Sequence, residues 1–208
     1  MLTINLFNGL VYGALLIVMS SGLALIYGLR RVVNFAHGAL YMLGAYLGYT
    51  VALHSNFWVA LVAAPAIMAV VGVLLDRYGF RLLQDREPLN VMLVTFGLLL
   101  ILEDAVVAIW GKGNYSIFTP ELLNFSVNVF GHDLPAYRIA VLFMGIAVAV
   151  GLTLWLRLSR IGLFVRAAST EPVTTSMQGV NTDVLSAGVV GLGSALAGLA
   201  GVVAGPFL

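Results

Sequence analysis

The sequence contains few charged residues and no cysteine. Only 9% of its 208 residues are Asp, Glu, Lys or Arg, whereas about a quarter is usual in a soluble domain. So few charges could not cover a water-facing surface, so we expect lipid to be the solvent of this chain. The absence of Cys excludes disulfides, thiolate metal sites and cysteine nucleophiles. The net charge of +1 gives no electrostatic basis for binding nucleic acid.

Motifs of catalysis and nucleotide binding are also missing. The sequence has no G-x-x-x-x-G-K-[ST] segment, so the chain cannot bind ATP as P-loop proteins do. It has neither G-x-S-x-G nor H-E-x-x-H, and His37, His54 and His132 have no acid-base partner at a recognisable spacing. The N-terminus lacks a basic region and an A-x-A-like cleavage site, so we expect no removable signal peptide. We therefore predict a protein that is not an enzyme and holds no cofactor or metal.

What the sequence does contain is long apolar runs, since 61% of the residues are hydrophobic. Each run is close in length to the about 20 residues that a helix needs to cross the hydrocarbon core. Ten-residue alternating segments typical of a barrel do not occur, which leaves helices as the spanning form. We predict an all-α, polytopic membrane helical bundle, a single transmembrane domain over residues 1–208. Its six expected spans are Leu6–Leu29, Val32–Leu53, Phe57–Leu75, Leu89–Trp110, Ile139–Leu156 and Val184–Leu208.

The loops between these runs differ in positive charge, which predicts orientation. Alternate loops hold eight arginines, and the remaining loops hold only Lys112 and, at a span edge, Arg138. Because the arginine-rich side faces the cytoplasm, we expect the N-terminus outside and residues 157–183 inside. The chain stops directly after an apolar run, so we expect C-terminal truncation. The eight arginines are Arg30, Arg31, Arg77, Arg81, Arg86, Arg157, Arg160 and Arg166.

Small residues recur at four-residue spacing in the spans, most clearly at Gly193, Ala197, Gly201 and Gly205. Such stripes allow helix backbones to approach closely in a membrane. They predict a tight multi-helix bundle. The longest outer loop, Gly111–Tyr137, is expected to be an ordinary surface loop, with a short hairpin at Phe125–Phe130 as the alternative.

Two groups of polar residues lie within or beside the spans. Glu103 and Asp104 fall in the outer third of the fourth span, where an acid must face an aqueous path or a partner. A shifted span that places both acids at the interface is the favoured alternative. Asn34-Phe35-Ala36-His37-Gly38 opens the second span. Gly38 could break the helix there and expose backbone groups to a substrate path, but an interfacial helix start with His37 at the headgroup level is favoured.

The segment Arg157–Asp183 is the longest polar break between apolar runs. Thr170 can cap a short helix with Glu171 and Pro172 in its first turn, and Gly179 can end it. We therefore expect a helix at about Glu171–Gln178, with Val173 and Met177 on one face. Two interpretations remain equal: docking of this face into the groove of a partner, or an amphipathic turn at the membrane surface.

Four stretches, in order, resemble the branched-chain amino acid ABC transporter permeases, and the smaller of their two paired permease subunits in particular. The most specific parts are NFAHG at Asn34–Gly38 and an R-x-G…R-A…G-[IV]-N pattern from Arg160 to Asn181. The resemblance covers nearly the whole chain. The four stretches are Gly22–Tyr46, Val94–Gly111, Arg157–Asp183 and Gly191–Pro206.

The resemblance implies an importer of Leu, Ile or Val in a bacterial or archaeal inner membrane. Its expected partners are a second permease subunit, two ABC ATPase subunits and a periplasmic or surface-tethered binding protein. Asn34, Phe35, His37 and Gly38 become candidates for the translocation path, with Glu103 and Asp104, although the family usually has an uncharged residue near Glu103. The expected ATPase-coupling residues are Arg160, Gly162, Arg166, Glu171, Pro172, Val173, Met177, Gly179 and Asn181.

Alternatives remain open for the function. Urea and short-amide ABC permeases share much of the same pattern, so the substrate is the weakest implication. An ion-coupled secondary transporter without an ATPase would use Glu103 or Asp104 as a titrating group. A non-transporting scaffold or truncated remnant would show no flux and would bind no ATPase.

Overall fold

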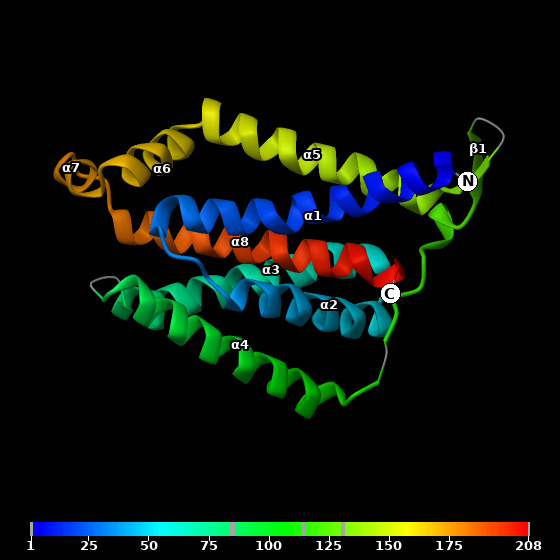
Figure 1. Cartoon of the computed structure of the whole chain (residues 1–208), viewed down its shortest axis with the longest axis horizontal. Helices are drawn as coiled ribbons and strands as arrows, with labels where there is room; N and C mark the ends of the chain where they lie inside the picture. The colour runs from blue at the N-terminus through cyan, green and yellow to red at the C-terminus, as the bar shows by residue number, and fades with distance from the viewer. Residues whose placement is uncertain (1, 84–85, 114, 130–131, 208) are drawn as a thin grey trace.

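The structure is a computed structural model that describes residues 2–83, 86–113, 115–129 and 132–207. Six long helices lie alongside one another and alternate in direction (Figure 1). This arrangement confirms the all-α polytopic bundle predicted from the sequence. The elements are α1 (Leu2–Arg30), α2 (Ala36–His54), α3 (Phe57–Tyr78), η1 (Phe80–Leu83), α4 (Pro88–Trp110), η2 (Glu121–Leu123), β1 (Ser126–Val129), β2 (His132–Pro135), α5 (Ala136–Leu158), α6 (Arg160–Thr170), α7 (Pro172–Met177), α8 (Thr182–Ala204) and η3 (Gly205–Phe207).

Within the described residues, five helical segments are long and apolar enough to cross a membrane. The chain is therefore a multi-pass membrane protein. The expected span outside these five is the second, which corresponds to α2, a 19-residue helix that is less apolar because it includes Tyr41, Tyr46 and Tyr49. The five segments are Ile4–Arg30, Phe57–Leu83, Pro88–Trp110, Ala136–Leu158 and Thr182–Phe207.

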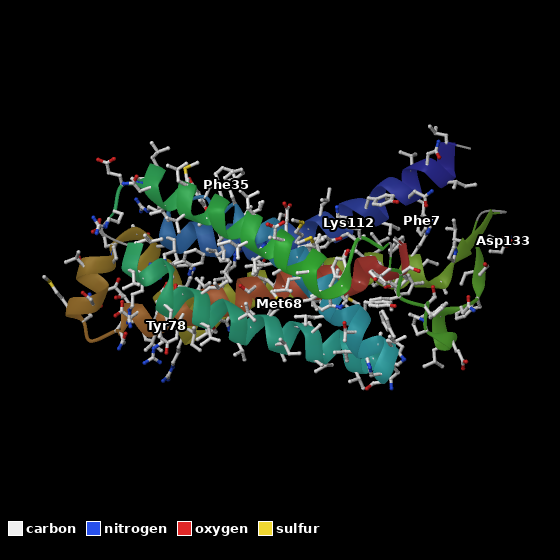
Figure 2. All side chains as sticks on the ribbon, turned by 90° about the horizontal axis from the view of Figure 1, so that it is seen from below. Phe7, Phe35, Met68, Tyr78, Lys112 and Asp133 are labelled. Carbon is white, nitrogen blue, oxygen red and sulfur yellow. The ribbon has the colours of Figure 1, made fainter. Side chains whose placement is uncertain are left out.

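The two ends of the bundle carry different connections. The α1–α2 and α3–α4 connections lie at the same end as α6 and α7, whereas the hairpin and both termini lie at the other end (Figure 1). Tyr78 marks the first end, and Asp133 lies at the second (Figure 2). The arginine-rich loops thus share one end, as the charge pattern predicts. The positive-inside rule predicts that this end faces the cytoplasm.

Helix α8 runs through the centre of the bundle and packs against α1, α2 and α3 (Figure 1). Gly193, Ala197 and Gly201 are all buried, which confirms the predicted packing stripe. One close approach is to α2, where a Cβ built on Gly44 would collide with the Cα of Gly198. Glycine is therefore required here because the two backbones are in direct contact.

The outer segment between α4 and α5 contains the hairpin that the sequence offered only as the alternative. Strands β1 and β2 pair antiparallel, with Asn128 opposite Asp133. The Nδ2 of Asn128 donates to Oδ1 of Asp133 at 2.9 Å. The favoured prediction of an ordinary surface loop is wrong for this part, because cross-strand pairing continues to Pro135. Phe130, at the end of the expected hairpin, lies outside the described residues.

The Gly44–Gly198 contact predicts a specific loss of stability. Gly44→Ala should separate α2 from α8 and destabilise the fold by about 1–3 kcal/mol, the usual cost of overpacking a filled interior. Gly97→Ala in α4 is the matched control, because a Cβ there meets no described atom within 4 Å. Thermal unfolding in detergent can be monitored by fluorescence-detected size-exclusion chromatography. The midpoint temperature should fall for Gly44→Ala and stay unchanged for Gly97→Ala. Equal midpoints for the two variants would contradict the close contact.

Candidate functional site

The connection between α1 and α2 is a non-helical segment, residues 31–35. Arg31 ends α1 in the left-handed region at φ 54°, while its N–H still donates to the carbonyl of Tyr27 at 2.7 Å. The side-chain oxygen of Asn34 then accepts from the N–H of Ala36 at 3.0 Å. This bond supplies a partner for the N–H of Ala36, the first residue of α2, while Phe35 occupies the cap position without a side-chain bond. The expected span Val32–Leu53 was wrong at its start for this reason.

This connection turns back into the bundle. The Nε2 of His37 lies 3.0 Å from the carbonyl oxygen of Met19, and since a carbonyl can only accept, Nε2 carries the proton. Met19 precedes the end of α1 at Arg30 by 11 residues, or about 16 Å along the helix. His37 is 2% exposed. His37 is therefore held inside the protein against α1, and its position at the headgroup level stays a prediction.

Helix α2 is continuous from Ala36 to His54, so it does not break at Gly38. The irregular backbone lies instead just before the helix. There the N–H of Phe35 donates to Oγ1 of Thr95 in α4 at 3.2 Å, and the Phe35 ring meets Phe96 edge-on. Non-helical backbone at membrane depth requires such partners, because lipid offers none. Asn34 thus bonds to the first residue of α2, and Phe35 contacts α4.

A cavity of about 280 Å³ lies beside this connection, at the end of the bundle that holds α6 and α7. Aliphatic side chains and polar side chains both line it. It is formed by α1, the α1–α2 connection, η1, α4, α6, α7 and α8. Its apolar lining includes Ile26, Leu29, Val32, Val33 and Val91, and its polar lining includes Arg30, Asn34, Arg86, Thr95, Thr182, Asp183 and Ser186.

A buried ion pair stands behind one wall of the cavity. The guanidinium of Arg30 in α1 contacts the carboxylate of Asp76 in α3, whose side chain is 2% exposed. Ser186 of α8 donates its Oγ–H to the same carboxylate oxygen at 3.0 Å. These bonds join three helices at the end of the bundle that holds α6 and α7 (Figure 1). Sequence reasoning missed this site because it considered only the adjacent acids Glu103 and Asp104, although a lone Asp76 near the end of an apolar run was a usable signal.

Glu103 and Asp104 lie elsewhere. Glu103 follows Pro88, the first residue of α4, by 15 residues, or about 22 Å, so it is within the helix and not at its edge. Both acids are exposed on α4, which packs mainly against α2. Neither lines the cavity beside Asn34. The structure therefore does not bring these two candidates together with Asn34–Gly38.

The polar segment after α5 contains two helices rather than one. Ser159 begins α6, and its Oγ accepts from the N–H of Gly162 at 2.8 Å. A Cβ at Gly162 would lie only 2.5 Å from the carbonyl oxygen of Leu156, so the tight α5–α6 corner requires glycine. The Ser159–Gly162 spacing was the signal for α6 that the sequence analysis did not use.

The short helix α7 begins differently from the prediction. Thr170 ends α6, and its Oγ1 donates to the carbonyl of Arg166 at 3.2 Å. The predicted Thr170 cap is therefore wrong, since Thr170 belongs to the preceding helix. Glu171 occupies the cap position and Pro172 follows as the first helical residue. The predicted stop is confirmed, because Gly179 has φ 86° just beyond the helix.

Side chains of the expected coupling region are largely at the surface. In α7, Val173 is 62% exposed and Met177 is 81% exposed, while Thr175 on the opposite face is buried. Arg160, Arg166, Glu171 and Pro172 are also exposed. Asn181 has a local role, because its Oδ1 accepts from the N–H groups of Asp183 and Val184 and so begins α8. The segment thus presents an apolar pair, Val173 and Met177, beyond the end of the bundle.

Comparison with known proteins places the chain in a family. The family model described as a branched-chain amino acid transport system permease component matches residues 5–207. The chain belongs to this family of transport permeases. Among curated relatives, the high-affinity branched-chain amino acid transport system permease proteins LivH of Escherichia coli K12 and BraD of Pseudomonas aeruginosa PAO1 are 27% and 28% identical to it. These alignments cover 98% and 97% of this chain and 70% of each relative.

A more distant relative comes from an archaeon. The probable branched-chain amino acid transport permease protein LivH of Methanocaldococcus jannaschii is 25% identical over 93% of this chain and 63% of its own length. No solved structure matches the chain.

The Arg30–Asp76 pair predicts unequal effects of removing two acids. Asp76→Ala should destabilise the fold by about 3–5 kcal/mol, because it leaves a largely buried guanidinium without its partner. Asp183→Ala is the control. Asp183 pairs with Arg81, but these side chains are 45% and 38% exposed, so its loss should cost about 0–1 kcal/mol. Thermal unfolding of the two variants in one detergent compares them, and an equal loss would contradict a structural role of the buried pair.

Proposed function

We propose that the chain is a permease subunit of an ATP-binding-cassette importer that carries branched-chain amino acids across the inner membrane. The observation that carries this proposal is the family match over residues 5–207, together with relatives named as branched-chain amino acid permeases. The chain has no P-loop motif. ATP-driven motion must therefore reach it from separate ATPase subunits.

The geometry supports a translocation path near the α1–α2 connection. A cavity with aliphatic and hydrogen-bonding walls suits an amino acid with a branched apolar side chain. Its position beside α6 and α7 means that a shift of these helices would change its walls. Ala168 of α6 and Pro172 of α7 both line it. Two states that differ in these contacts could open the path alternately to either side.

The exposed face of α7 supports the coupling role. Val173 and Met177 lie four residues apart and point away from the bundle, since both are strongly exposed. An apolar pair of this kind fits a groove in a partner protein. We propose that an ATPase subunit binds this face. A second permease subunit and a substrate-binding protein at the outer end would complete the importer.

Import and coupling can be measured together. In vesicles containing the complete complex, radiolabelled leucine should accumulate only with ATP and the binding protein. Val173→Asp with Met177→Asp should reduce uptake at least about tenfold, because two carboxylates would have to be buried at the ATPase contact. ATP hydrolysis by the complex should no longer respond to the binding protein.

The conservative pair Val173→Ile with Met177→Leu is the matched variant, and it should retain uptake because it keeps an apolar face. Unchanged uptake in the acidic pair would refute the coupling role of α7. Uptake of urea in preference to leucine would favour the amide permeases. Uptake that persists without an ATPase and fails in Glu103→Gln would favour an ion-coupled transporter.

A further inference from the structure

Two residues that line the cavity beside the α1–α2 connection carry hydrogen-bond donors that no described residue uses. Nε of Arg30 and Nδ2 of Asn34 are both buried, and neither has a hydrogen-bond partner within the described part of the chain. Both residues line the cavity. A buried donor without a partner is costly, and native structures rarely leave one unless a ligand or water fills the place.

The hydrogen bonds already made by these side chains explain why the donors remain. Arg30 uses its Nη2 for Asp76, which leaves Nε. Asn34 uses its oxygen to accept from Ala36, which fixes the amide so that its nitrogen cannot take over that position. Asn34 is only 6% exposed, and the connection that carries it is fixed at both ends by helices. The donors are thus held in place before any ligand arrives.

The charge around the cavity favours an anion near these donors. The lining contains the guanidinium groups of Arg30 and Arg86 and the carboxylate of Asp183. Asp183 is paired with Arg81 and Arg30 with Asp76. Among the residues that the structure describes, Arg86 has no ion-pair partner, so the lining carries an excess of positive charge. Two N–H donors beside an excess positive charge match a carboxylate.

The remaining lining restricts which carboxylate would fit. Ile26, Leu29, Val32, Val33 and Val91 form an aliphatic wall of the same cavity. The volume of about 280 Å³ lies just below the range of about 300–1,000 Å³ that is typical of small-molecule pockets. A small acid with an aliphatic side chain uses both kinds of wall, whereas a neutral amide or inorganic anion does not.

We propose that Asn34 and Arg30 bind the α-carboxylate of the transported amino acid in this cavity on its way to the cytoplasm. This inference rests on the proposed function and names the binding group within the path. It also distinguishes substrates, since urea and short amides have no carboxylate to place there. Asn34 would be a direct ligand through Nδ2, and Arg30 through Nε.

The test compares leucine with leucinamide, which keeps the side chain and the ammonium group but lacks the carboxylate. Binding is measured to the complete complex in nanodiscs, without ATP or binding protein, using tritiated leucine and competition by leucinamide. The native complex should bind leucine at least about tenfold more tightly, because only leucine satisfies both donors. Equal affinities would overturn the proposal, as would displacement of leucine by inorganic phosphate at equal concentration.

Asn34→Asp provides the sharpest variant. Its carboxylate keeps the cap to Ala36, loses the Nδ2 donor and adds a negative charge, so leucine should bind at least about tenfold more weakly and leucinamide equally or more tightly. Asn56→Asp is the matched control, because Asn56 caps α3 through Val59 N–H outside this cavity. It should leave both affinities unchanged. Parallel losses for both ligands in Asn34→Asp would indicate misfolding or a purely structural role and would overturn the assignment.

Arg30→Lys gives an independent check in case Asn34→Asp does not fold. Lysine keeps a positive charge for Asp76 but has no Nε donor in the same position, so discrimination between leucine and leucinamide should fall severalfold. Retained discrimination in a folded Arg30→Lys complex would exclude the Nε contact. The experiment is separate from the test of function. A complex that imports leucine yet binds leucine and leucinamide equally would refute the carboxylate site alone, and one that prefers leucine yet fails to import it would refute the importer alone.

Discussion

The structure depends on one constraint: inside a membrane, polar groups must find their partners within the protein. Most of the chain meets it with helices, whose backbone bonds are internal. The exception is residues 31–35, which turn back beside α1 without forming a helix. Their backbone and side chains bond to Thr95 and to the start of α2, and the neighbouring Arg30 pairs with Asp76. The elements around this segment supply hydrogen-bond partners for it or line the cavity beside it.

The central position of α8 follows from a second property of the membrane, the apolar character of its lipid tails. Lipid tails are as apolar as leucine side chains, so helices gain little by hiding apolar surface and gain instead from close contact. Glycines and alanines along α8 allow α1, α2 and α3 to approach its backbone. This packing leaves α4 and α5 at the periphery (Figure 1). At the end of the bundle that holds α6 and α7, Arg30, Asp76 and Ser186 then join α1, α3 and α8.

The spans, their alternation and the small-residue stripe could be predicted, because each depends on local composition. The depth at which α2 begins could not, since it depends on the contact of His37 with Met19 and not on the hydropathy of residues 32–53. Similarly, the residues after Thr170 have the local pattern of a helix start, but Thr170 does not cap that helix because α6 extends through it. Gly9 and Gly13 also had the spacing of a packing stripe, yet a Cβ at either meets no described atom within 4 Å. Spacing identifies a possible contact, and only the fold decides which contacts form.

The candidate site shows the same division between local and tertiary information. The sequence identified Asn34 by its motif, but a motif cannot say which of its atoms is free. That depends on the bond from Ala36, which occupies the oxygen and leaves the nitrogen, and on the pairing of Arg30 with an acid 46 residues away. Conversely, Glu103 and Asp104 were the most conspicuous acids in the sequence and yet lie apart from the cavity. Burying an acid within a span costs free energy unless the acid has a partner. Its neighbours in the fold determine whether that partner is a substrate, another helix or an arginine.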